Sequence, residues 1–154
     1  MAWGGICASG KTPLIFLEKG VKVDQHLYLR DVLKAVLLPW ATYHLGDTNW
    51  IFQQDSAPAH RAKSVQEWYS DNFPDFIAWT EWPPYSPDLN PMDYSVWSIL
   101  EARACAKRHA TVEALKHSLL VEWEKISIAE LRAIAQNFTK RLRLCVSAKG
   151  DHFE

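Results

Sequence analysis

The segment from Trp82 to Pro91 constrains the fold more than any other part of the sequence, because it carries four prolines in ten residues. Proline has a fixed φ and no amide hydrogen, so this segment cannot form a helix interior or a central strand. We therefore predict an extended, stiff loop. Pro91 suits the first turn of a following helix, where its missing amide hydrogen is not needed.

Short apolar runs and helical patterns precede this loop. Residues 3–8 and 13–18 are strand-like runs around Ser9-Gly10-Lys11, which predicts a β-hairpin. Asp24 is a candidate N-cap for a helix, and Pro39 should end that helix. The chain therefore begins, on this interpretation, with a hairpin and one amphipathic helix.

Two more strand candidates flank a second helix. Residues 50–54 are a short apolar run whose length suits a buried strand, with Asp55 just past its C-terminal end. Residues 62–72 have helical spacing, and residues 76–79 are a second strand candidate. Strands that alternate with helices predict an α/β domain.

The chain after the loop is predicted to be helical. One helix should follow Pro91 and another should begin at Thr111. A last amphipathic helix over 128–144 ends in basic residues, which suits the negative end of its dipole. Together with the first half, this pattern predicts an α/β fold with a helical C-terminal cap.

The composition is that of a single globular domain. The 154 residues are 48% apolar and 23% charged, which argues against a disordered or collagen-like chain. No apolar run of about 18 residues exists, so no transmembrane helix is expected. The three cysteines lack the spacing of a metal finger, and we interpret them as reduced thiols of an intracellular protein.

The charge is distributed unevenly along the chain. Residues 1–100 hold seven Lys and Arg against eleven Asp and Glu, whereas residues 101–145 hold nine against five. The second half could therefore face an anionic partner. Two solvated helix faces explain the same asymmetry, and the charge balance alone favours that reading.

Asp55 and Asp93 are the candidates for chemistry. Asp55 follows a strand, where ligands of parallel sheets bind, and Asp93 lies in the first turn of a helix. Carboxylate oxygens suit Mg²⁺ or Mn²⁺, and two such ions can serve phosphoryl transfer. The alternative is structural: Asp55 could cap the Ala57-Pro58 turn, and Asp93 could stabilise a helix N-terminus. We interpret His60 as part of the turn packing, because it has no Cys or His partner at ligand spacing.

Two motifs resemble those of mariner-type transposases, of the Tc/mariner superfamily. Their second-aspartate motif is similar to Gln53-Gln54-Asp55-Ser56-Ala57-Pro58-Ala59-His60. Their third-carboxylate motif is similar to Trp82-Pro83-Pro84-Tyr85-Ser86-Pro87-Asp88-Leu89-Asn90-Pro91-Met92-Asp93-Tyr94. Thirty-seven residues lie between Asp55 and Asp93, which resembles the branch of the superfamily that uses a third aspartate at this spacing.

The resemblance implies a ribonuclease H-like fold and Mg²⁺- or Mn²⁺-dependent cleavage and strand transfer of DNA in the nucleus. It implies catalytic and metal-binding roles for Asp55 and Asp93. It also implies that the proline loop acts as a clamp toward the other subunit of a homodimer, with Trp82, Pro84 and Tyr85 in that loop. Sequence-independent phosphate contacts are expected from four basic residues: Arg61, Lys63, Lys107 and Arg108.

The chain departs from the family pattern in one respect. The first catalytic aspartate and its strand have no counterpart in the sequence, and neither have the helix-turn-helix modules. We therefore expect residues 1–154 to be the C-terminal part of a catalytic domain, with an incomplete mixed sheet, marginal stability and no DNA cleavage. The alternative is a non-enzymatic, transposon-derived remnant that acts as a protein- or DNA-interaction module.

Overall fold

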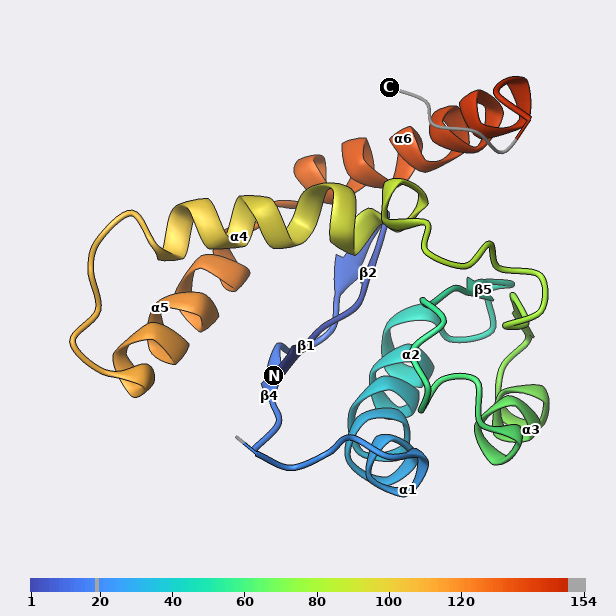
Figure 1. Cartoon of the computed structure of the whole chain (residues 1–154), viewed down its shortest axis with the longest axis horizontal. Coiled ribbons are helices and arrows are strands. Elements are labelled where there is room, and N and C mark those ends of the chain that lie inside the picture. Colours follow the sequence, from blue (N-terminus) through green and yellow to red (C-terminus); the bar gives the residue numbers. More distant parts are fainter. Residues whose placement is uncertain (19, 150–154) are drawn as a thin grey trace. The chain divides into compact units, whose positions relative to one another are not determined.

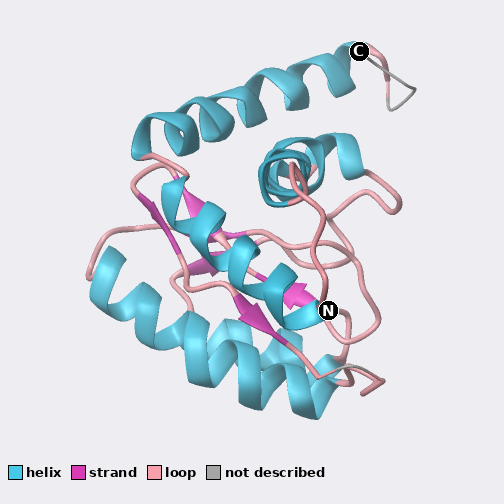
Figure 2. Cartoon of the chain, turned by 90° about the vertical axis from the view of Figure 1, so that its left-hand side faces the viewer, coloured by secondary structure: helices cyan, strands magenta, loops and turns pink. Residues whose placement is uncertain are grey.

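The computed structural model describes residues 1–18 and 20–149 (Figure 1). The chain divides into two units. Unit 1 comprises Met1–Trp3 and Leu17–Ser86, and unit 2 comprises Gly4–Phe16 and the chain from Pro87 onward. Both units mix short strands with longer helices (Figure 2).

Unit 1 contains one long helix built from three consecutive segments: α1 (Gln25–Leu27), the π-helical η1 (Tyr28–Leu37) and α2 (Leu38–Leu45). The predicted cap is confirmed, since Asp24 Oδ1 accepts from the amides of His26 and Leu27, each at 2.9 Å. The predicted stop at Pro39 is wrong, because the helix continues to Leu45. The Leu38 amide donates to a carbonyl five residues back, and this wider turn accommodates a proline that has no amide to donate.

A parallel pair of strands carries the chain toward Asp55. Ile51–Phe52 (β5) pairs with Asp75–Phe76 (β6), and Ile77 N donates to Phe52 O at 2.9 Å. The expectation of a buried strand is wrong for Ile51, which is 61% exposed. Among the described residues β6 is the only strand that pairs with β5, so one edge of β5 has no neighbouring strand.

The second helix of unit 1, α3 (Lys63–Asn72), lies where a helix was predicted. Its buried face presents Val65 and Tyr69. The Tyr69 ring lies 5.2 Å from Phe52 and 5.3 Å from Phe73, between centroids. Aromatic packing therefore fixes α3 against β5. The first strand of the chain, β1 (Ala2–Trp3), also belongs to this unit.

Unit 2 begins with the predicted hairpin, but its turn is shifted. Ile6–Cys7 (β2) pairs antiparallel with Gly10–Lys11 (β3), with Cys7 opposite Gly10. Ala8 and Ser9 therefore form a two-residue turn, a common hairpin connection, and Gly10 lies in a strand rather than in the turn. Ile15–Phe16 (β4) follows.

Helices form the rest of unit 2. The proline segment contains no helix longer than the single turn η2 (Pro87–Leu89), as predicted. The bounds of the later helices are η3 (Met92–Val96), α4 (Trp97–Ala104), α5 (Val112–Lys125) and α6 (Ile128–Ser147). The Thr111 hydroxyl caps α5 by accepting from Ala114 N at 3.1 Å. Helix α6 runs past residue 144, so its basic residues lie before its last turn and not in it.

Trp123 on α5 is the centre of the core of unit 2. Its side chain is fully buried, and its indole Nε1 donates to the Thr12 carbonyl at 2.8 Å. Lys11 Nζ donates to the Ile126 carbonyl at 2.8 Å, just past the end of α5. The hairpin segment and the helical half are therefore joined through the end of α5. Among the described residues, no helix is both long and apolar enough to cross a membrane.

A capping box at the start of α6 makes the stability of unit 2 depend on pH. Ser127 N donates to Glu130 Oε2 at 2.8 Å, Glu130 N donates to Ser127 Oγ at 3.2 Å, and Arg103 pairs with Glu130 Oε1. The Ser127 amide, and then Arg103, lower the pKa of Glu130 from 4.5 to about 2. A carboxyl whose pKa falls on folding stabilises the fold above its unfolded pKa, and that stabilisation is lost as pH falls through the folded pKa.

We expect Glu130→Gln to lower the melting temperature at pH 7 by about 2–4 °C, since a helix cap contributes on the order of 1 kcal/mol. The difference from the wild type should shrink between about pH 4.5 and pH 2, and circular dichroism melts would measure it. Glu124→Gln, at an exposed position of α5, is the matched control. A difference that stays constant over this range would show that the carboxylate charge is not responsible.

Candidate active site

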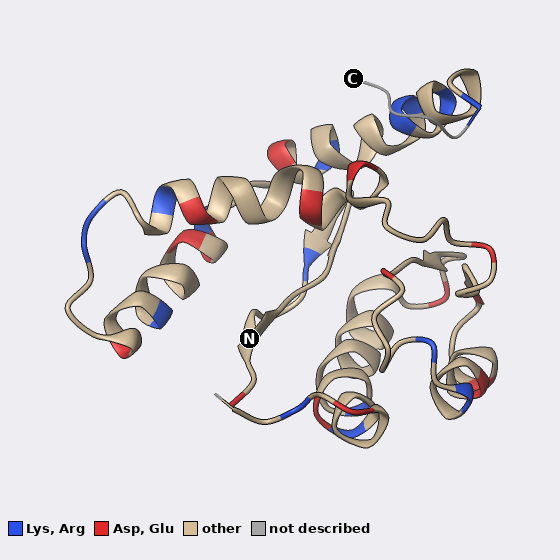
Figure 3. Cartoon of the chain, in the orientation of Figure 1, with Lys and Arg blue, Asp and Glu red and all other residues tan. Residues whose placement is uncertain are grey.

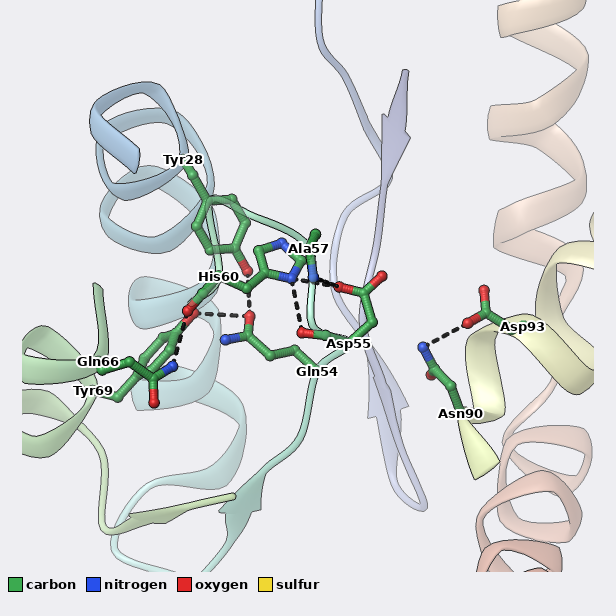
Figure 4. Close-up of polar contacts among 9 residues, drawn as sticks. All are labelled: Tyr28, Gln54, Asp55, Ala57, His60, Gln66, Tyr69, Asn90 and Asp93. Atoms are coloured by element: carbon green, nitrogen blue, oxygen red, sulfur yellow. Dashed lines mark hydrogen bonds and ion pairs between the residues drawn. The ribbon is translucent and has the colours of Figure 1, made fainter. Parts of the chain in front are cut away.

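Asp55 lies three residues past the end of β5 and is held within its own loop. Its Oδ1 accepts from Ala57 N at 3.1 Å and lies 2.6 Å from His60 Nδ1 (Figure 4). The expected turn-capping role of Asp55 is therefore present. The hydrogen bond from His60 is the main cause that lowers the pKa of Asp55, so this carboxyl is ionised at neutral pH.

A buried hydrogen-bond network supports the residue before Asp55. The hydroxyls of Tyr28 and Tyr69 both donate to Gln54 Oε1, each at 2.8 Å (Figure 4). The Tyr28 ring also lies 4.4 Å from the His60 ring, between centroids. Burial raises the pKa of both tyrosines, so both keep their hydroxyl hydrogens. Contacts from the first helix and from α3 therefore stabilise the Asp55 loop.

Asp93 is the second residue of η3 in unit 2. Asn90 Nδ2 donates to Asp93 Oδ2 at 2.9 Å (Figure 4). Asn90 Oδ1 accepts from Met92 N at 3.2 Å. Asn90 is buried and caps the first turn. The carboxylate of Asp93 therefore lies at a helix N-terminus, as predicted, where the helix dipole favours negative charge.

The two aspartates belong to different units, Asp55 to unit 1 and Asp93 to unit 2. Within the described chain, no three His, Cys, Asp or Glu side chains are grouped so that they could hold a metal ion. The individual donors nevertheless fit Mg²⁺ or Mn²⁺ in type, because both are carboxylate oxygens. Asp55 is 52% exposed, and the polar contacts of its carboxylate within the described residues fall on Oδ1, which leaves Oδ2 for a cation.

The four predicted DNA-contacting residues are all exposed. Arg61 and Lys63 flank the start of α3; the Arg61 guanidinium lies 6.0 Å from the Trp79 ring centroid, and Lys63 pairs with Glu67 at 3.6 Å. Lys107 and Arg108 lie in the connection between α4 and α5, where basic residues are visible in Figure 3. The four residues thus form one basic pair on each unit.

The proline loop presents its residues in two ways. Trp82 is 7% exposed, whereas Pro84 is exposed and Tyr85 is fully exposed. Tyr85 also has a positive φ of 54°, which is uncommon for a residue other than glycine. Of the three residues predicted for a dimer clamp, two are therefore accessible to a partner.

Unit 2 also has an open groove of about 480 Å³ between η3 and α6. Sequence reasoning did not identify it, because its walls come from segments about 40 residues apart. Tyr94 is fixed beside it by a hydrogen bond from its hydroxyl to the Ile134 carbonyl, at 2.9 Å. The lining residues are Tyr94, Ser95, Ala133, Ile134, Gln136, Asn137 and Lys140.

Sequence reasoning also missed the surroundings of Asp55. His60 takes part in the packing of its turn, as predicted, but its contact with the Asp55 carboxylate was not predicted. Tyr28 was not singled out in the sequence, yet it is only 2% exposed. The five-residue separation of Asp55 and His60 around a proline bend was the available signal for the first contact. No local signal connects Tyr28 to Gln54.

Comparison with known proteins adds a family match. The sequence model of the DDE superfamily endonucleases matches residues 2–116, a range that includes both aspartates. The transposase of the transposable element Tcb1 of Caenorhabditis briggsae is 29% identical over 150 residues, which are 97% of this chain and 52% of that protein. The Tc1 transposase of Caenorhabditis elegans is 26% identical with the same coverage. The chain thus spans about half the length of the curated relatives that it matches.

Solved structures show the same fold. The catalytic domain of Mos1 mariner transposase superposes with a TM-score of 0.80 at 23% identity, covering 96% of this chain and 72% of that one. A Mos1 mariner paired end complex with Mn superposes with a TM-score of 0.83 at 22% identity, covering 97% and 43%. The similarity supports the ribonuclease H-like α/β fold that was expected.

Proposed function

The chain belongs to the DDE superfamily endonucleases and is a mariner-type transposase catalytic domain, and we propose that it contributes two carboxylates, Asp55 and Asp93, to a site for divalent-metal-dependent phosphoryl transfer on DNA. One observation carries this proposal. The Asp55 carboxylate is ionised, half exposed and held by Oδ1 just past the end of a parallel strand, so that Oδ2 can bind a cation.

Asp93 is proposed as the second ligand. Its hydrogen bond from Asn90 orients the carboxylate in the first turn of η3. Mg²⁺ or Mn²⁺, when bound, would supply Lewis acidity to the phosphoryl groups of DNA. Asp55 and Asp93 contribute hard oxygen donors, and each is oriented by a neighbour on its own segment. A solved relative is described as a paired end complex with Mn, which agrees with this choice of metal.

We expect weak binding of Mn²⁺ by this chain, and Asp55→Asn should abolish it, because the amide lacks the charge that holds a hard cation. Asp93→Asn should do the same. Isothermal titration calorimetry with MnCl₂ alone measures the effect. Asp31→Asn is the matched control, because Asp31 is an aspartate whose carboxylate pairs with Arg30 on the first helix. Binding that survives in both single variants would contradict the proposal.

DNA cleavage is proposed to need a third carboxylate that these 154 residues do not contain. Two carboxylates hold a cation without clamping both the attacking and the leaving oxygen. Within the described part of the chain β5 pairs with β6 alone and Ile51 is exposed, which supports an incomplete sheet. The purified chain should therefore leave supercoiled plasmid intact in MnCl₂. Nicking that Asp55→Asn removes would overturn this part of the proposal.

DNA is proposed to bind weakly in the nucleus through the basic pairs Arg61 with Lys63 and Lys107 with Arg108. Each phosphate contact releases a counterion, so affinity should fall steeply with salt. We expect Lys107→Ala/Arg108→Ala to reduce the slope of log K against log salt by about 2, measured by fluorescence anisotropy on duplexes of unrelated sequence. Lys116→Ala is the control, because Lys116 pairs with Glu113. An unchanged slope would exclude these contacts.

A non-enzymatic interaction module remains the second candidate, and the full exposure of Tyr85 favours it. Pro84 and Tyr85 would contact a second copy of the chain. Tyr85→Gly removes the ring and suits the positive φ, so it should abolish self-association without lowering stability. Sedimentation velocity tests this, and a monomeric wild type would rule out the homodimer.

A further inference from the structure

The Asp55–His60 contact determines which ring nitrogen of His60 carries hydrogen. His60 Nδ1 lies 2.6 Å from Asp55 Oδ1 and 3.2 Å from the Asp55 carbonyl oxygen. Both partners of Nδ1 are acceptors, because a carbonyl oxygen and an ionised carboxylate have no hydrogen to donate. Nδ1 must therefore be the donor, and His60 holds the backbone and the side chain of one residue through a single N–H group.

The His60 ring is itself fixed from the opposite side. It lies 4.4 Å from the Tyr28 ring, and its side chain is only 16% exposed. The Tyr28 hydroxyl donates to Gln54, the residue immediately before Asp55 (Figure 4). Tyr69 donates to the same oxygen. The ring and the carboxylate it contacts are thus connected through one network within unit 1, which restricts both rotamers.

We infer that His60 is a positioning residue, which engages Oδ1 of Asp55 through Nδ1–H and so directs Oδ2 toward a bound cation. This inference rests on the proposed metal-binding role of Asp55. His60 is not a metal ligand in this arrangement, because its Nδ1 is committed to Asp55. A histidine that orients a carboxylate ligand reverses the common pairing in which a carboxylate orients a histidine ligand.

If His60 positions Asp55, two conservative replacements of His60 should have opposite effects. Asparagine places its amide nitrogen near the position of Nδ1, whereas glutamine places it near the position of Nε2. His60→Asn should therefore keep the Asp55 contact, and His60→Gln and His60→Ala should lose it. His44→Ala is the matched control, because the His44 ring stacks on Trp40 at 4.7 Å on α2 in the same unit.

Two metal-free measurements on the full chain test the positioning role. Long-range ¹H–¹⁵N spectra should show the His60 ring with hydrogen on Nδ1. Hydrogen exchange of the Ala57 amide, which donates to Asp55 Oδ1, should speed up about tenfold in His60→Ala and His60→Gln, the size expected for losing one charge-assisted hydrogen bond. It should change little in His60→Asn and His44→Ala. A neutral ring with hydrogen only on Nε2, or equal exchange in all variants, would overturn the inference.

Titration with Mn²⁺ alone separates this inference from the proposed function. Paramagnetic broadening of the Ala57 amide signal should require about tenfold more Mn²⁺ in His60→Ala than in the wild type, and His60→Asn should restore the wild-type response. Equal broadening in His60→Ala and the wild type would overturn the directing role. If the wild type shows no broadening at this loop, the metal-binding role of Asp55 fails, and so does the directing role that rests on it. The metal-free measurements then decide only whether His60 orients Asp55.

Discussion

Replacing Trp123 with alanine is expected to lower the free energy of unfolding by about 3–5 kcal/mol, the usual cost of deleting a buried aromatic side chain. The Trp123 ring is fully buried, lies 6.4 Å from the Trp97 ring between centroids, and donates to the Thr12 carbonyl. Its loss leaves a cavity and an acceptor without its donor. Urea denaturation followed by circular dichroism measures the change, and a loss below about 1 kcal/mol would show that the site collapses without cost.

A second substitution tests whether close packing is the reason. A Cβ added at Gly4 would lie 2.9 Å from the Trp123 ring, so Gly4→Ala should destabilise the wild type by about 1–3 kcal/mol. In the Trp123→Ala variant, Gly4→Ala should lower the free energy of unfolding much less, because the ring that the added Cβ would contact is absent. A double-mutant cycle measures this coupling. Strictly additive changes in the free energy of unfolding would show that the Trp123 ring does not restrict the side chain at position 4.

Replacing Gln54 with leucine is expected to lower the free energy of unfolding by about 2–4 kcal/mol. Two buried hydroxyls, from Tyr28 and Tyr69, lose their common acceptor, and each unsatisfied group costs about 1–3 kcal/mol. The change also loosens the residue before Asp55. Urea denaturation gives the cost, and hydrogen exchange at the Ala57 amide reports the effect on the loop.

The control is to remove the donors as well. Adding Tyr28→Phe and Tyr69→Phe to Gln54→Leu should recover most of the lost stability, because no buried polar group is then left without a partner. Gln53→Leu is the matched single control, since the buried side-chain nitrogen of Gln53 has no hydrogen-bond partner among the described residues. If the triple variant is no more stable than Gln54→Leu, lost packing rather than unsatisfied hydroxyls explains the cost.

Local chemistry made several parts of the fold predictable from the sequence. The cap at Asp24 and the helix start at Thr111 were identified because a short polar side chain can reach the free amides of its own first turn. The proline segment was identified as a loop because proline excludes regular structure wherever it occurs. The turn contact of Asp55 with Ala57 followed from two residues of separation.

Predictions failed where a residue's effect depended on distant neighbours. Pro39 did not end its helix, because the turn before it is π-helical. Its wider hydrogen-bond spacing accommodates a residue that has no amide hydrogen. Ile51 was expected to be buried, but burial requires a second neighbouring element and not only an apolar side chain. The hairpin turn moved to Ala8 and Ser9, where the pairing of Gly10 with Cys7 determines the register.

The sequence by itself determined the helix starts, the proline break and the motifs that identify the family, because each depends on residues close together along the chain. Only the tertiary structure decided that His60 contacts Asp55, that two tyrosines from separate helices share Gln54, and that Trp123 closes on Gly4. Those contacts join segments whose separation no local pattern encodes, and they form because burial brings polar groups together that must then be satisfied.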